Sequence, residues 1–174
     1  MNKNRLITIS GVLFMLLFSC GFAQSKVGFV NSQDILSGTA EGTKKLAELD
    51  EFWAGKQKDF DSRNQEISTL QQNIMAQQRT LDADSLAKMQ RDLEQKQKDL
   101  TRFQEDSRAE GTQKQNEILQ AISQKVQVII EEYAKNNAFA VIFVIDQSQA
   151  YVSPKLDVTA EIIKLYDEKY PFGS

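Results

Sequence analysis

The sequence has no histidine, and its single cysteine, Cys20, lies close to the N-terminus. Without histidine, the chain lacks the commonest general base and the commonest metal ligand of proteins. Ser-His and Cys-His mechanisms are therefore excluded, and a lone cysteine cannot form a disulfide within the chain. Chemistry that uses carboxylates alone is left, but it needs a concave site, for which the sequence offers little material. We expect no enzyme activity, no cofactor and no bound metal.

Positive charge is in short supply as well. The chain has 21 basic and 24 acidic residues, and removal of residues 1–23 would leave 19 basic residues against the same 24 acidic ones. A protein that binds nucleic acid needs a concentrated basic surface. We therefore expect no nucleic-acid partner.

An apolar run from Leu6 to Phe18 follows two basic residues at the N-terminus, and Gly21–Ala23 supplies the small residues that a signal peptidase reads. The run is too short for a comfortable membrane span. The sequence therefore predicts a signal peptide over residues 1–23 and export to the periplasm. Two alternatives are an uncleaved anchor and a lipid attached to Cys20, because the residues before Cys20 loosely resemble a lipoprotein cleavage box.

Proline and glycine, which interrupt helices, are almost absent from the middle of the chain. No proline occurs within residues 24–153, and Gly55 and Gly111 are the only glycines within residues 43–135. Most other residues there favour helices. Apolar residues recur at alternating steps of three and four, as along a coiled-coil seam. The apolar members of this first seam are Leu46, Leu49, Trp53, Phe60, Ile67, Leu70, Ile74 and Leu81.

A second seam follows, is interrupted near residues 107–111, and then resumes with a shifted phase. This shift predicts a local change in supercoiling or a kink. Between the two seams, Asp82 is a predicted helix N-cap. The pattern predicts an antiparallel helical hairpin over residues 39–135 with its tip near residues 80–85. The apolar members of the second seam are Leu86, Met89, Leu93, Leu100, Phe103, Ile118, Ile122, Val126, Ile129 and Tyr133.

The two ends of the chain, residues 24–38 and 136–174, predict a small β-rich body with a C-terminal helix. Residues 26–31 are typical of a strand. The continuous apolar run of residues 139–145 is typical of a strand that is buried on both faces.

Turn residues then predict how the chain continues. Residues 146–149 favour a turn, after which residues 150–153 are expected to return as a hairpin partner. Asp157 is expected to cap the final helix.

Three short strands and one helix are too little to enclose such an apolar strand. Other copies of the same chain would supply the missing layers most simply, which predicts a symmetric homo-oligomer with a shared core. The alternative is that the base of the hairpin folds over the sheet. The residues expected in the oligomer core are Val27, Phe29, Phe139, Val141, Phe143 and Ile145.

Val27–Asn31 with Gln33–Leu36, then Tyr133–Ile145, then Asp157–Thr159 occur in this order around the long hairpin. Together these segments resemble the Skp/OmpH family of periplasmic chaperones, over the whole mature chain. The resemblance implies an α+β homotrimer whose strands form a shared β-barrel-like body, with one helical hairpin per chain projecting as a tentacle. An unfolded outer-membrane protein would be held between these arms without ATP.

The tip of the hairpin holds the residues that we expect to contact such a client. They are Met75, Arg79, Lys88, Met89 and Arg91. Methionine is soft and adapts to apolar segments, but each methionine could instead pack in the seam between the helices. Weak contact of the tip with a membrane surface is a further expectation, although residues 75–102 hold six basic and five acidic side chains, whereas the tips of the family are basic.

The hairpin pattern by itself is also that of a generic coiled coil. The alternative function is therefore a structural spacer or adaptor of the cell envelope, anchored by a lipid on Cys20.

Overall fold

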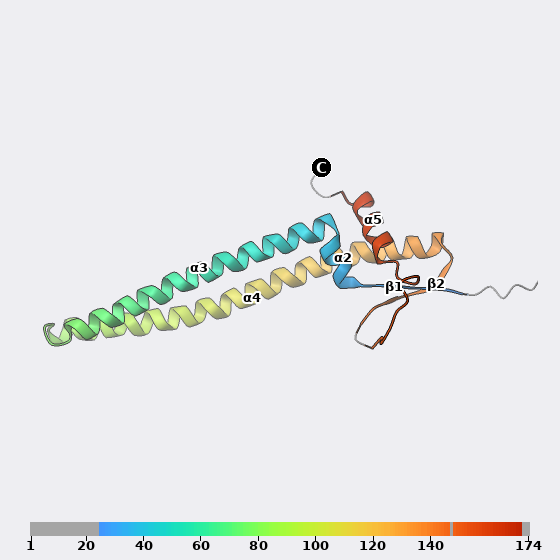
Figure 1. The fold of residues 1–174 in the computed structure, drawn as a ribbon. Coiled ribbons are helices and arrows are strands. Elements are labelled where there is room, and N and C mark those ends of the chain that lie inside the picture. Colours follow the sequence, from blue (N-terminus) through green and yellow to red (C-terminus); the bar gives the residue numbers. More distant parts are fainter. Residues whose placement is uncertain (1–24, 147, 172–174) are drawn as a thin grey trace, which may run out of the picture.

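The computed structural model describes residues 25–146 and 148–171, in which a long two-helix arm projects from a small mixed base (Figure 1). The predicted signal peptide and Cys20 lie outside the described residues. The base combines β1 (Lys26–Val30), α2 (Ser32–Gly38), β2 (Phe139–Val144) and α5 (Thr159–Lys169).

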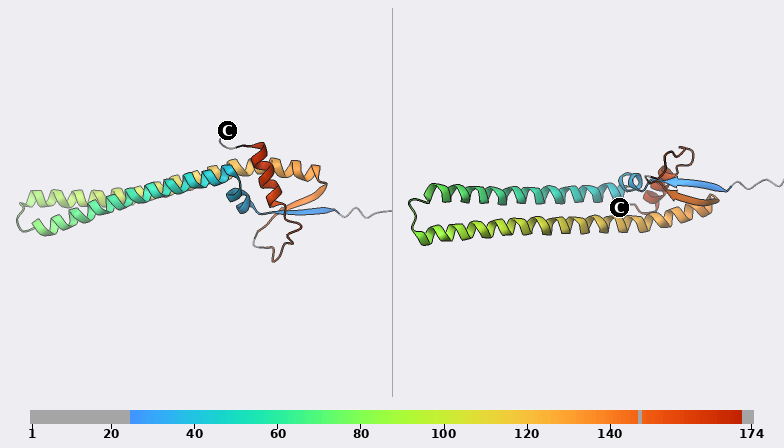
Figure 2. Two further views of the ribbon diagram at one scale, coloured as in Figure 1. Left: turned by 45° about the horizontal axis from the view of Figure 1, so that its top comes forward. Right: turned by 90° about the horizontal axis from the view of Figure 1, so that it is seen from below.

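The arm consists of α3 (Ala40–Gln77) and α4 (Ala83–Asn136), which run antiparallel side by side (Figure 2). The 54 residues of α4 span about 80 Å at 1.5 Å per residue. Because α3 has only 38 residues, α4 continues beyond the start of α3 and reaches the sheet. The arm and the base therefore share one continuous helix.

Asp82 is the N-cap of α4, as the sequence predicted. Its Oδ1 accepts a hydrogen bond from the backbone N–H of Ser85 at 2.9 Å, and its Oδ2 accepts one from the Ser85 hydroxyl at 2.8 Å. These hydrogen bonds lower the pKa of Asp82 below its ordinary value. The negative charge is thus held at the positive end of the helix dipole.

The break in the second seam coincides with a close contact between the two helices. The helix α4 runs through residues 107–111 without interruption. Here the indole of Trp53 lies against α4, and a Cβ at Gly111 would collide with it. Ser107 and Gly111 are both buried at this point. The small residues therefore make room for an indole from the other helix.

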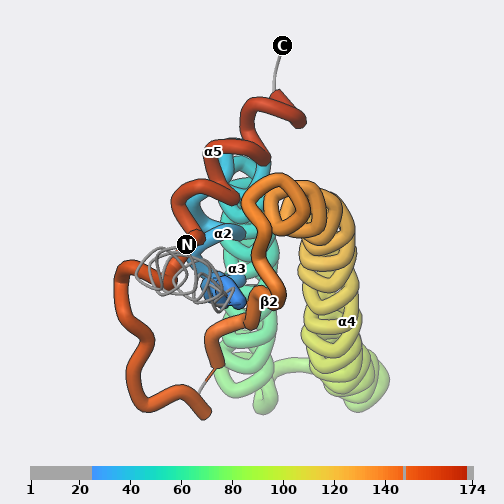
Figure 3. Tube along the Cα trace, turned by 90° about the vertical axis from the view of Figure 1, so that its right-hand side faces the viewer, coloured from blue at the N-terminus to red at the C-terminus, as the bar shows by residue number. Residues whose placement is uncertain are grey.

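The strands β1 and β2 form a parallel two-stranded sheet, and the whole arm connects them. On the other edge of β1, Phe29 donates to the carbonyl of Leu156 at 2.8 Å and accepts from the N–H of Val158 at 2.9 Å. The prediction that residues 150–153 return as a strand is wrong. The chain leaves β2 through a projecting loop and meets β1 only at residues 156–158 (Figure 3).

The core of the molecule lies where α4 passes under α2, α5 and the sheet. Its buried side chains are Val30, Ile35, Leu36, Ile122, Ile129, Val158, Ile162 and Tyr166. The N-cap of α5 is Val158, which makes no side-chain capping hydrogen bond, so the prediction that Asp157 is the cap is wrong. Asp157 lies one residue earlier, and its Oδ1 accepts from the N–H of Thr159 at 2.9 Å. Because Ile122 and Ile129 of α4 pack in the same core as Val30 of β1, the base of the hairpin covers one face of the sheet.

Candidate interaction surfaces of the base and the arm

The side of the sheet that faces away from the core is apolar and partly open. Val27 pairs with Val141 and Phe29 pairs with Phe143, so these four side chains share one face, which we call the outer sheet face. The rings of Phe29 and Phe143 lie 5.6 Å apart between centroids. Val141 is 40% exposed and Phe143 is 48% exposed. In a single chain, β2 is therefore not buried on both faces, and burial of its second face would need further copies of the chain, as the sequence predicted.

The edge of β2 is open as well. Within residues 25–146 and 148–171, β2 pairs only with β1, so its other edge has no strand beside it. An edge strand with exposed apolar side chains is a template for pairing with another chain. The outer sheet face and this edge together form an apolar surface that is open in the single chain.

One of the six residues predicted for the oligomer core, Phe139, faces the core of the single chain instead. The ring of Phe139 packs against Tyr133 at 5.5 Å and lies over Gly28, on the side of the core. The cause is a register shift between Lys26 and Val27, which turns the start of β2 inward. Ile145 is half-buried and its N–H donates to the carbonyl of Val30 at 2.7 Å.

An apolar groove of about 500 Å³ lies beside the open strand, between α2, α4 and β2. Val144, which is 51% exposed, and Leu119, which is 40% exposed, line it. Sequence reasoning missed this groove, although the exposed position of Leu119 just off the second seam was a usable signal. The groove extends the apolar surface around the end of the sheet.

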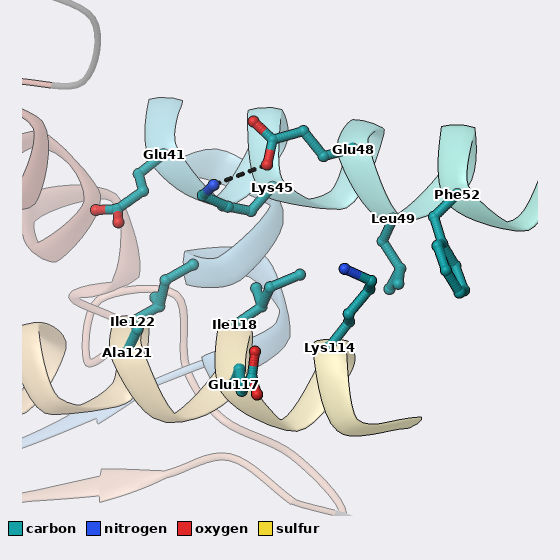
Figure 4. Close-up of a pocket in the computed structure, with 10 residues that line it drawn as sticks. All are labelled: Glu41, Lys45, Glu48, Leu49, Phe52, Lys114, Glu117, Ile118, Ala121 and Ile122. Atoms are coloured by element: carbon teal, nitrogen blue, oxygen red, sulfur yellow. Dashed lines mark hydrogen bonds and ion pairs between the residues drawn. The ribbon is translucent and has the colours of Figure 1, made fainter. Parts of the chain in front are cut away.

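A second cavity, of about 320 Å³, lies between α3 and α4 at the root of the arm (Figure 4). Its mouth carries charged side chains, among them Lys45 and Glu48, whose ion pair is 2.7 Å long. The hydrogen bond from Lys45 lowers the pKa of Glu48. Glu117 accepts a hydrogen bond from Gln113 at 2.8 Å. The pKa values of Glu41 and Glu48 are both lowered, which is the opposite of what a general acid needs.

A buried polar network closes the inner end of this cavity, and sequence reasoning missed it. Glu41 on α3 accepts from Lys125 on α4 at 2.7 and 2.8 Å and from the hydroxyl of Tyr166 on α5 at 2.7 Å. Burial alone would raise the pKa of Glu41, but the two hydrogen-bond donors outweigh it and lower the pKa. Burial and the bond to Glu41 raise the pKa of Tyr166. The network fixes the arm to the base.

The predicted tip residues lie on both sides of the turn formed by residues 78–82. Met75 is 70% exposed, so the alternative that it packs in the seam is wrong, whereas Met89 is half-buried. Arg79, Lys88 and Arg91 are exposed, and none of them forms an ion pair with a described residue. The tip therefore offers one open thioether and three unpaired positive charges.

Residues 25–146 and 148–171 contain no cluster of acidic or cysteine side chains that could hold a metal ion. Of the helices in these residues, none has the length and apolar character needed to cross a bilayer.

Comparison with known proteins connects this architecture to a family. The family model described as outer membrane protein (OmpH-like) matches residues 26–166. The crystal structure of a candidate OmpH-like outer membrane chaperone from Caulobacter crescentus CB15 superposes with a TM-score of 0.74 at 15% identity, over 86% of this chain and 88% of the other. No curated protein sequence matches the chain. The family match covers both the arm and most of the base.

Proposed function

The chain belongs to the OmpH-like outer membrane protein family, and we propose that it is an ATP-independent holdase chaperone of the periplasm. Its clients would be unfolded outer-membrane proteins, which it would hold between helical arms so that they do not aggregate. The observation that carries this proposal is that one chain combines an open apolar sheet with a long polar arm.

Assembly is the first step of the proposal. The outer sheet face leaves Val141 and Phe143 40% and 48% exposed, and β2 has an unpaired edge among the described residues. Exposed apolar surface beside an unpaired strand favours association of several copies. We propose a homotrimer in which the sheets of the copies form one barrel-like body. The arms would then project from a common hub.

Enclosure of the client is the second step. Several arms of about 57 Å, the length of the 38-residue α3, that start from one hub would surround a space large enough for an unfolded chain. Exposed strands of such a chain aggregate through their edges and apolar faces. Polar arms would separate one client from the next without binding it irreversibly. Met75, Met89 and the cations at the tip would add adaptable contacts to the client or to a membrane surface.

An aggregation assay tests this function. Purified mature protein should suppress light scattering when a urea-unfolded β-barrel protein is diluted into buffer, at about one trimer per client and without nucleotide. The same sample is sized by multi-angle light scattering. A stable trimer that fails to suppress scattering at severalfold excess would contradict the holdase and favour an envelope spacer. A monomer would contradict the shared hub.

A further inference from the structure

The aromatic residues of the arm are gathered in one stretch. Apart from Tyr133 beside the sheet, the helices α3 and α4 contain only Phe52, Trp53, Phe60 and Phe103 as aromatic residues. We call these four the mid-arm aromatic cluster. Lys56 lies over the rings of both Phe52 and Phe103, at 5.0 and 5.7 Å from their centroids, so the members from the two helices lie close together.

A groove of about 250 Å³ opens in this cluster. Trp53, Phe60 and Phe103 supply its apolar walls, and Gln57 and Gln104 supply amides. Its volume lies just below the range of roughly 300–1,000 Å³ that is typical of small-molecule sites. The groove therefore suits a single large side chain that belongs to a longer chain.

One polar group in this groove has no partner. Ser107 is 6% exposed, lines the groove, and its hydroxyl makes no hydrogen bond with any described residue. A buried hydroxyl without a partner is unfavourable, and most such groups in proteins are satisfied. The oxygen itself has almost no accessible surface, so a backbone N–H or carbonyl of a bound peptide would satisfy it only after the side chain turns toward the groove.

The indole of Trp53 is held in place before any ligand arrives. It packs against the backbone of α4 at Gly111, and its ring meets that of Phe52 edge-on, with centroids 5.3 Å apart. Trp53 is nevertheless 40% exposed. An aromatic ring that is fixed on one side and open on the other binds a partner at low entropic cost.

Cations lie over two rings of the cluster, in a stretch that also carries acidic residues, and Lys56 itself is paired with Glu110 at 2.8 Å. Arg63 lies 4.5 Å from the ring centroid of Phe103, and Lys114 lies 5.3 Å from that of Phe52. Arg108 lines the groove itself. Cations at this distance from aromatic faces also attract the face of a further aromatic ring. The occupant that fits is an aromatic side chain in an extended polypeptide.

We propose that the mid-arm groove binds aromatic side chains of unfolded client chains, with the Ser107 hydroxyl bonded to the client backbone. The inference rests on the proposed holdase function and gives it a specific contact site, which lies along the arm and not at its tip. Aromatic residues would then mark the segments of a client that the arms hold.

Trp53 is the only tryptophan of the protein, so its fluorescence reports directly on the groove. The probe is a short tryptophan-free peptide of alternating Thr and Val with one central Phe, and its matched control carries Leu in place of that Phe. The Phe peptide should change the emission of Trp53 saturably and bind about fivefold more tightly than the Leu peptide. Equal affinities, or no change at millimolar peptide, would overturn the proposal.

The variant Ser107→Ala separates a ligand contact from a structural role. It should weaken binding of the Phe peptide about fivefold while the melting temperature stays the same or rises, because an unpaired buried hydroxyl is removed. Ser62→Ala, at an exposed position of α3, is the matched control and should change neither quantity. A lower melting temperature for Ser107→Ala with unchanged peptide affinity would make the hydroxyl structural and overturn the assignment.

Two further outcomes identify the reason for a failure. If Trp53 emission depends on protein concentration without peptide, a second copy of the arm fills the groove, and the proposal is wrong. If the wild-type chain suppresses aggregation of a β-barrel client but binds neither peptide, the groove is wrong and the holdase function stands. If it does not suppress aggregation, the holdase function itself is contradicted.

Discussion

At the base of the molecule Ile162 and Tyr166 are completely buried, whereas along the arm most seam residues are only half-buried. The base packs α2, α4, α5 and the sheet around one core, but the arm has only two helices and one line of contact. Its interhelical ion pairs, such as Lys96–Glu66 at 2.7 Å, are exposed to solvent. Exposed pairs of this kind contribute little stability.

This difference indicates that the base of the chain is more stable than the arm. Local stability follows the number of buried contacts, so the arm should open at a lower free energy than the base. The buried network of Glu41, Lys125 and Tyr166 lies at the junction of the base and the arm. The proposed holdase function would need this division, because the hub would have to persist while the arms adapt to different clients.

The largest effect should come from a charge placed on the outer sheet face. Phe143→Asp should dissociate the oligomer, because assembly would bury an unpaired carboxylate. The free subunit should keep its helical content, since Phe143 is 48% exposed in the single chain. Sizing by light scattering together with circular dichroism measures both quantities.

Met75→Asp is the matched control for this variant, because Met75 is 70% exposed at the other end of the molecule. It should leave the oligomer intact. An intact oligomer for Phe143→Asp would show that the base assembles through another surface.

Equal truncations at the base and on the arm should have unequal effects on stability. Ile162→Ala removes a completely buried side chain and should lower the free energy of unfolding by about 3 kcal/mol. Ile74→Ala removes a half-buried one from α3 and should cost about 1 kcal/mol. Urea unfolding at a fixed protomer concentration compares the two. Similar losses would mean that the arm is as well packed as the base.

The sequence predicted the features that depend on local pattern. The three-four spacing of apolar residues predicted the arm, and Asp82 predicted the start of α4, because a cap bonds only to its own first turn. The apolar run at Phe139–Val144 predicted β2 through its β-branched and aromatic content.

The features that were missed depend on residues far apart in the chain. Glu41 and Tyr166 are 125 positions apart, so no local pattern connects them. Residues 150–153 looked like a hairpin partner because neighbouring strands usually pair, but the free edge of β1 is taken by residues 156–158. The inward turn of Phe139 follows from one register shift that sequence periodicity does not show.

The network at the junction should make stability depend on acid. Its hydrogen bonds lower the pKa of Glu41 below the ordinary value of 4.5, so the folded state favours the carboxylate. This contribution is complete above pH 4.5 and is lost as the pH falls through the lower folded-state pKa. Glu41→Gln should cost about 2 kcal/mol at pH 7, because Lys125 and Tyr166 lose a charged acceptor.

The pH dependence separates this network from the other carboxylates. Between pH 7 and pH 3 the difference in unfolding free energy between wild type and Glu41→Gln should shrink, as measured by urea titrations at each pH. Glu94→Gln, on an exposed arm pair with Lys98, is the control and should have little effect at either pH. A constant difference across this range would show that Glu41 acts through packing and not through charge.

The smallest effects, with opposite signs, should come from alanine at two of the arm glycines, Gly55 and Gly111. Gly55→Ala adds a methyl group where nothing lies within 4 Å, so it should stabilise the helix by about 0.5–1 kcal/mol. Gly111→Ala gains the same helix propensity but forces the Trp53 indole away from α4, an overpacking that costs about 1–3 kcal/mol. Its net effect should be a loss of about 1 kcal/mol, with a change in Trp53 emission. Thermal unfolding monitored by Trp53 fluorescence measures both the change in stability and the change in emission. If both alanine variants were more stable than the wild type, the indole would not be fixed against α4.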